Sequence, residues 1–140
     1  MLKKNSLVVV GVALAAMVMV AGCQQRRTTK GPAALKTVYF DFDKSDIRSD
    51  QKSVMEGNAN WIKGHSKKVG IAGHCDERGT NEYNVALGQR RANGAKKYLV
   101  SLGVADGSLS TVSHGEEKPT CTQSTEACWA KNRRDEFTAK

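Results

Sequence analysis

The sequence lacks several motifs that commonly mark enzymes and metal proteins. It contains no paired C-x-x-C, no H-E-x-x-H and no serine-centred G-x-S-x-G elbow. These motifs are the usual signatures of structural zinc sites, zinc proteases and serine hydrolases. No internal repeat is visible either. The absences argue against a hydrolase, a zinc site and a repeat architecture, and no metal or other cofactor is expected.

Long apolar stretches are also scarce. The longest uncharged apolar run covers residues 7–20 and follows Lys3 and Lys4. It is shorter than the roughly 20 residues that a membrane-spanning helix needs. Small residues follow it directly, so residues 1–22 are predicted to be an export signal that is removed. A permanent N-terminal anchor helix is the alternative reading.

The end of this run resembles the lipobox of bacterial lipoprotein signals, with the sequence Val20-Ala21-Gly22-Cys23. The resemblance implies that Cys23 carries lipid and becomes the N-terminus. Each buried methylene contributes about 0.8 kcal/mol, so several acyl chains hold a protein at a membrane that one chain holds only reversibly. By the same resemblance, Gln24 after the cysteine favours the outer membrane. We therefore expect a lipid-anchored protein on the periplasmic face of the outer membrane.

Composition limits the partners of the mature chain. Without Lys3 and Lys4 the basic residues fall from 22 to 20 against 14 acidic ones, which leaves a formal charge of +6 on residues 23–140. A basic balance favours anionic partners. In the periplasm these are cell-wall polymer and lipid head groups rather than nucleic acid. A solvated surface that only keeps the protein soluble is the alternative.

Two regions follow the signal. Residues 23–36 form a polar segment with Gly31-Pro32, typical of a flexible tether. Fully extended, such a tether reaches at most about 45 Å. Residues 37–140 are the right length for one folded domain.

The domain alternates strand and helix patterns. Apolar residues alternate at Val38, Phe40 and Phe42, which predicts a strand. A helix follows, opened by Ser or Asp caps between residues 45 and 50 and ended by Gly64. The remaining predicted elements are a strand at 68–75, a helix from Thr80 or Asn81 to Gly103, a strand at 109–114, a short helix at 126–132 and a strand at 133–139. This order predicts an α/β sandwich, a mixed sheet with helices on one face.

The second helix carries the clearest periodic face. Apolar or small residues recur there at steps of three and four, namely Val85, Gly88, Ala92, Ala95, Leu99 and Leu102. Such a face is expected to pack on the sheet.

Five ordered blocks resemble the peptidoglycan-associated lipoproteins of Gram-negative bacteria. They are YFDFDK at 39–44, GHCDERGT at 73–80, YNVALGQRRA at 83–92, GEEKP at 115–119 and KNRR at 131–134. The resemblance implies the fold of the C-terminal domain of outer membrane protein A. It also implies non-covalent binding of the diaminopimelate in a peptidoglycan stem peptide, Tol-type periplasmic partners, a role in envelope integrity and cell division, and no enzymatic activity.

The same resemblance assigns the binding residues. Asp76 would accept from the ligand ammonium, and Arg91 would clasp its carboxylate with two parallel N–H groups. Arg78 would contact the stem peptide. Phe42 and Asp43 match pocket positions, and alternation places Phe42 on the core face, so its backbone is expected to touch the ligand. Without the resemblance, Asp76 and Arg91 read equally well as a structural ion pair and Arg78 as a solvated charge.

The cysteines depart from the family pattern. Cys121 and Cys128 lie in a segment that is variable in the family, and in an oxidising compartment they are expected to form a disulfide. Cys75 is then the odd thiol, expected to be small and half-buried. An envelope hydrolase using His74, Cys75 and Asp76 is the rival hypothesis. Neighbours on a strand point to opposite faces, which argues against it for His74 and Cys75.

The last predicted strand also departs from the family, because it contains Asp135 and Glu136 where the family is usually apolar. Two acids in a buried strand would be costly, so we expect this strand to be an edge or frayed.

The lipobox prediction is tested by Cys23→Ala. The variant should remain a full-length precursor without lipid, because the thiol that receives diacylglycerol is gone. Mass spectrometry of the membrane fraction measures this. Normal cleavage with acylation at another residue would refute the prediction.

Overall fold

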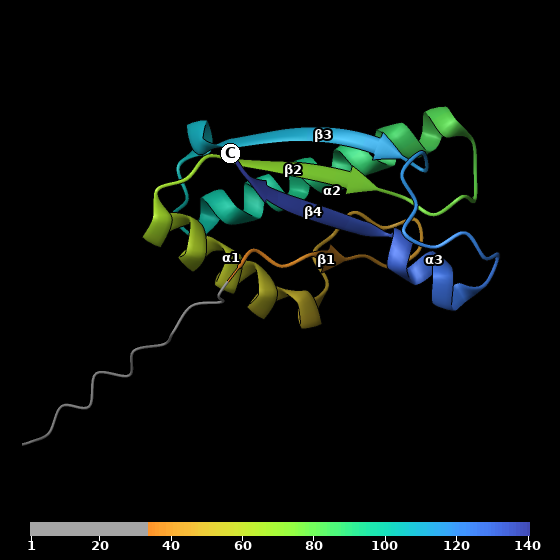
Figure 1. Ribbon diagram of the computed structural model, residues 1–140, viewed down its shortest axis with the longest axis horizontal. Helices are drawn as coiled ribbons and strands as arrows, with labels where there is room; N and C mark the ends of the chain where they lie inside the picture. Colours follow the sequence, from red (N-terminus) through yellow and green to blue (C-terminus); the bar gives the residue numbers. More distant parts are fainter. Residues whose placement is uncertain (1–33) are drawn as a thin grey trace, which may run out of the picture.

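A computed structural model of the protein describes residues 34–140, which fold around one four-stranded sheet (Figure 1). The signal at 1–22, Cys23 and most of the tether lie outside these residues. The strand order is β1-β4-β2-β3, with β2 and β3 parallel and the other neighbours antiparallel. The elements in chain order are β1 (Val38–Tyr39), the 3-10 turn η1 (Ser49–Gln51), α1 (Lys52–His65), β2 (Val69–His74), α2 (Asn81–Ser101), η2 (Asp106–Ser108), β3 (Leu109–Gly115), α3 (Glu126–Asn132) and β4 (Arg134–Ala139).

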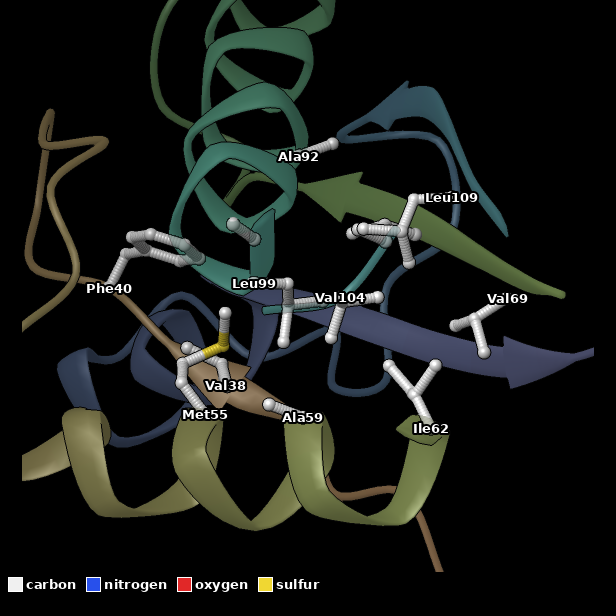
Figure 2. Close-up of a cluster of buried hydrophobic side chains, with 12 residues drawn as sticks. Val38, Phe40, Met55, Ala59, Ile62, Val69, Ala92, Leu99, Val104 and Leu109 are labelled. Carbon is white, nitrogen blue, oxygen red and sulfur yellow. The ribbon is translucent and has the colours of Figure 1, made fainter. Parts of the chain in front are cut away.

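The predicted order of elements is confirmed, as is a mixed sheet with the two long helices on one face. Val69 and Ile71 point to the same side of β2 and belong to a buried cluster with side chains from both helices (Figure 2). The core members from the helices are Met55, Ala59 and Ile62 of α1 and Ala92, Ala95 and Leu99 of α2. The short helix α3 lies at the end of the sheet opposite the C-terminus (Figure 1). No helix among residues 34–140 is long and apolar enough to cross a membrane.

The start of α2 follows the expected signal, but the start of α1 does not: α1 begins at Lys52, after the 3-10 turn η1, and no Ser or Asp side chain caps either element. Thr80 caps α2, and its hydroxyl accepts a hydrogen bond from the Tyr83 N–H. Helix α1 continues past Gly64 to His65, and Ser66 takes the left-handed conformation that ends it. The structure thus corrects the predicted stop at Gly64, because Ser66 supplies the positive φ there.

The apolar face of α2 is also corrected at its start. Val85 is exposed, whereas Asn84, Leu87, Gly88 and Arg91 are buried. The first turns of α2 face loops that follow β1 and β2 rather than the aliphatic core, so polar side chains can be buried there with hydrogen-bond partners.

Strand β4 is an inner strand, which contradicts the expected edge. It pairs with β1 at Asp135 and with β2 along five residues. Asp135 is fully buried, and neither of its carboxylate oxygens has a hydrogen-bond partner in the described part of the chain. Burial raises the pKa of Asp135 well above its ordinary value, against the opposing charge of Arg91. A protonated carboxyl group is what makes this acid tolerable inside the sheet.

Two glycines bring α2 onto the sheet. A Cβ on Gly73 of β2 would overlap the carbonyl oxygen of Gly88 in α2, and a Cβ on Gly88 would overlap the hydroxyl of Ser113 in β3. The absence of side chains at these positions lets the helix backbone approach both strands. The helix register, and with it the position of Arg91, depends on this approach.

The predicted disulfide is confirmed. Cys121 and Cys128 are bonded, and the bond joins the loop before α3 to the helix itself. Cys75 is a free thiol, as expected, but it is buried rather than half-buried, because the start of α2 covers it. Asn132 supports the same loop, since its side chain accepts from the Cys121 N–H and donates to the Cys121 carbonyl.

Gly73→Ala should lower the free energy of unfolding by about 1 to 3 kcal/mol, because the added methyl group forces α2 away from β2. Denaturant unfolding followed by circular dichroism measures this. Gly64→Ala is the matched control: it lies within α1 with nothing near its Cβ. That variant should gain roughly 0.5 to 1 kcal/mol. Equal effects in the two variants would contradict the close approach.

Asp135→Asn should raise the thermal unfolding temperature at pH 7. A carboxyl group whose folded pKa is raised favours folding only while it is protonated, so its contribution falls as the pH rises above the ordinary value of 3.8. The advantage of the amide should therefore shrink as the pH is lowered towards about 4. Unfolding curves from pH 4 to 8 measure this, and a difference that does not depend on pH would contradict it.

Candidate functional site

A cavity of about 220 Å³ lies where β2 ends, between the loop after β1, the loop after β2 and the first turns of α2. The structure brings all five predicted site residues to it. Its lining consists of Phe42, Asp43, Cys75, Asp76, Arg78, Gly79, Tyr83, Asn84, Leu87 and Arg91. Residues 42–43 and 91 are far apart in the sequence, so the sheet and α2 together create this site.

Asp76 is the central acid of the cavity. It is buried, and its carboxylate accepts from the Nε of Arg78 at 3.1 Å, from the Nη2 of Arg78 at 2.8 Å and from the backbone N–H of Arg78 at 3.0 Å. Arg133 approaches the same carboxylate at 3.4 Å. Burial alone would raise the pKa of Asp76, but the hydrogen bonds and charge of Arg78, with Arg133, outweigh it and lower the pKa. The acid is therefore ionised at neutral pH.

Arg91 forms the floor of the cavity and is only 1% exposed. Its Nε donates to the carbonyl of Lys44 at 2.8 Å, its Nη1 to that of His74 at 2.8 Å and its Nη2 to that of Asp41 at 3.0 Å. This corrects the expected free fork of N–H groups. It also removes the alternative of an Asp76–Arg91 ion pair, because within residues 34–140 Asp76 pairs with Arg78 and Arg133.

Phe42 differs from the prediction. Strand β1 ends at Tyr39, so the alternation does not extend to Phe42, and its side chain is 54% exposed. The ring lies against the guanidinium of Arg78, 3.8 Å from its carbon to the ring centroid. The ring of Phe42, rather than its backbone alone, is thus available at the mouth of the cavity.

Asp43 stands in a left-handed conformation with φ of 55°. Its carboxylate accepts a hydrogen bond from the hydroxyl of Tyr83 on α2. Asn84, on the same helix, donates to the carbonyls of Asp76 and Arg78 and to the carboxylate of Glu116. These bonds join both loops to the start of α2, so the cavity has a defined shape.

Sequence reasoning missed Tyr83, which lines the cavity, and two residues that contact the site from α3 and its end. Arg133 reaches Asp76 from the end of α3, and Trp129 of α3 lies 4.1 Å from the guanidinium carbon of Arg78, measured to the ring centroid. Arg133 belongs to the KNRR block, and that resemblance was the available signal. Trp129 had none, because only folding brings α3 beside the loop after β2.

His74, Cys75 and Asp76 do not form the catalytic arrangement of the rival hypothesis. Burial raises the pKa of the Cys75 thiol to about 11, and the thiol donates a hydrogen bond to the carbonyl oxygen of Asn84. The His74 ring lies instead near His114 and Glu136, and burial lowers its pKa to about 4. A neutral thiol without a nearby base is a poor nucleophile. Among residues 34–140 no group of three or more His, Cys, Asp or Glu side chains is placed to hold a metal ion.

Comparisons with known proteins agree with this architecture. The chain is 37% identical over 145 residues to the peptidoglycan-associated lipoprotein of Mesorhizobium japonicum, covering 88% of this chain and 86% of that protein. It is 45% identical over 104 residues to the protein of the same name from Pseudomonas aeruginosa, covering 74% of this chain and 62% of that protein. The chain therefore spans less than two thirds of the second relative.

A solved structure is also similar. The crystal structure of the peptidoglycan-associated lipoprotein from Burkholderia pseudomallei matches with a TM-score of 0.72 and 40% identity, over 75% of this chain and 90% of that one. Residues 39–133, which include every predicted binding residue, match the OmpA family. The chain belongs to the OmpA family and, within it, is a relative of the peptidoglycan-associated lipoproteins.

Proposed function

We propose that this protein binds peptidoglycan non-covalently, through the diaminopimelate of the stem peptide. The free end of diaminopimelate presents an ammonium and a carboxylate on one carbon, so its site needs an acceptor beside several donors. The observation that carries the proposal is the cavity at the end of β2, where the ionised Asp76 lies beside the guanidinium groups of Arg78 and Arg91. The names of the relatives support the same class of ligand.

Within this proposal Asp76 accepts from the ligand ammonium, and the arginines attract the carboxylate. Arg91 contributes positive charge and a remaining N–H on Nη2, since its other hydrogen bonds hold the cavity floor. Arg78 is the more exposed of the two, so it is better placed to offer two parallel N–H groups. Phe42 and Asp43 form the mouth through which the ligand enters.

The location proposed for the protein is the periplasmic face of the outer membrane. Residues 1–22 act as the signal, Cys23 carries the lipid, residues 23–36 are the tether and residues 37–140 are the binding domain. A domain held within about 45 Å of its lipid must meet the wall close to the membrane. Holding the outer membrane to the wall is the expected consequence, with a role in envelope integrity and cell division together with Tol-type partners.

A binding role without chemistry fits the electrostatics of the cavity. The one thiol there has a raised pKa, and the acid is occupied by arginines, so neither group is prepared to attack a bond or to move a proton. Two carboxylates working as acid and base would need pKa values that the environment pushes apart around neutrality. The pKa of Asp76 is instead lowered, so its carboxyl group stays ionised.

Asp76→Asn tests the proposal. The amide keeps the shape of the side chain but cannot balance the ligand ammonium, so binding to diaminopimelate-containing walls should weaken by about 2 to 5 kcal/mol. Co-sedimentation of the purified domain with isolated walls measures this, with thermal unfolding to confirm that the variant is folded.

Asp106→Asn is the matched control. Asp106 is exposed, pairs with Lys96 at 3.2 Å and lies before β3, at the opposite end of the sheet from the cavity. This variant loses the same charge and should bind as the parent protein does. If the two variants shift binding equally, and salt abolishes binding to all walls alike, then the overall charge binds the polymer and the cavity does not.

A further inference from the structure

The carboxylate of Asp76 is already saturated. Its Oδ1 accepts from the backbone N–H and the Nε of Arg78, and its Oδ2 accepts from the Nη2 of Arg78 and the Nη1 of Arg133. A carboxylate offers about four lone-pair sites, so these donors fill it. A ligand ammonium can bond to Asp76 only by taking the place of one of them.

The side chain of Arg78 is the donor that can leave. Arg133 is almost fully buried and also donates to the carbonyl of Phe40 at 3.0 Å and to Glu126, so it is held from three sides. The backbone N–H of Arg78 is fixed by the loop. The side chain of Arg78, by contrast, is 29% exposed. Both of its side-chain hydrogen bonds go to Asp76, and its other ion pair, with the exposed Glu126 at 3.8 Å, is long.

Two aromatic rings hold Arg78 independently of Asp76. Its guanidinium carbon lies 3.8 Å from the ring centroid of Phe42 and 4.1 Å from that of Trp129. A cation between two ring faces is stabilised by both. A guanidinium that slides between these rings can therefore release Asp76 and still remain at the cavity mouth.

Helix α3 holds Trp129 in place. The indole Nε1 donates to the Glu77 carboxylate at 3.0 Å, and the hydroxyl of Ser124 donates to the same oxygen at 2.7 Å. The Cys121–Cys128 disulfide closes this segment. The ring that faces Arg78 is thus part of a fixed wall.

We propose that Arg78 is a specificity-determining residue that works by exchange, and that Trp129 positions it. In the empty site Arg78 stands where the ligand ammonium will lie. The entering ammonium takes its hydrogen bonds on Asp76, and the displaced guanidinium turns between Phe42 and Trp129 to take the ligand carboxylate. This inference rests on the proposed function and adds the reason for selectivity.

The exchange selects a zwitterion over a simple amine. A diaminopimelate end replaces the cation on Asp76 and also supplies a new anion for Arg78, so no charge is left without a partner. A lysine end supplies the cation only. The displaced guanidinium would then have only the exposed Glu126 carboxylate, 3.8 Å from its Nη2 and already paired with Arg133. Leaving a partly desolvated charge unpaired is costly, so lysine-containing peptides should bind more weakly.

The experiment is a calorimetric titration of the domain with two synthetic stem tripeptides that differ in the third residue, meso-diaminopimelate or L-lysine. The parent protein should prefer the diaminopimelate peptide by roughly 10- to 100-fold. In Arg78→Gln the preference should fall towards one, with weaker binding of the diaminopimelate peptide and equal or tighter binding of the lysine peptide. Lys67→Gln, an exposed charge before β2, is the control and should keep the parent preference.

Trp129 gives a second and more direct measurement. In Trp61→Phe, Trp129 is the single tryptophan, and its fluorescence should shift when the diaminopimelate peptide displaces Arg78 beside it. The shift should be lost in Trp61→Phe combined with Arg78→Gln. Trp129→Ala should reduce the peptide preference, and Trp129→Phe should restore most of it, because a second ring face is present again.

The outcomes separate this inference from the proposed function. An unchanged preference in Arg78→Gln, or an equal loss for both peptides, overturns the exchange while peptide binding by the parent protein still supports the function. If the parent protein binds neither peptide, the proposed function fails, and the exchange fails with it.

Discussion

The site depends above all on the buried guanidinium of Arg91. It donates to carbonyls of Asp41, Lys44 and His74, and so it joins the loop after β1 to the end of β2 from one position on α2. An unpaired charge in a protein interior is costly unless hydrogen bonds satisfy it. Carbonyl groups do so here, and Arg91 forms no salt bridge with any residue that the structure describes. The glycine contact between Gly73 and Gly88 brings α2 near enough for this reach.

A second group of residues, on and beside α3, supports the cavity from outside. Helix α3 and the disulfide loop present Trp129 and Arg133 to the Asp76 loop, and Glu126 holds Arg133 in turn. Arg91 thus holds the lining loops through their backbone carbonyls, whereas side chains of α3 and Arg133 contact Arg78 and Asp76 from outside the cavity lining. A rigid floor with a more exposed cation at the mouth is an arrangement suited to binding a charged ligand by exchange.

Two buried acids of the domain have pKa values that are shifted in opposite directions. Asp76 stays ionised because arginines surround it, and its pKa is lowered despite burial. Asp135, on the inner strand β4, has no hydrogen-bond partner among residues 34–140, and burial raises its pKa well above the ordinary value. Hydrogen bonds from guanidinium groups, present at Asp76 and absent at Asp135 within residues 34–140, decide which of the two buried acids stays ionised.

The sequence by itself determined the order of elements, the Thr80 cap of α2, the disulfide and five of the residues that line the cavity, because periodicity, caps and the family blocks are local signals. Only the tertiary structure decided how those residues are used. In the folded protein β4 is an inner strand and Phe42 is exposed. Arg91 donates to backbone carbonyls, and Trp129 lies beside Arg78. These facts depend on strand pairing and on contacts between distant segments, which no local pattern encodes.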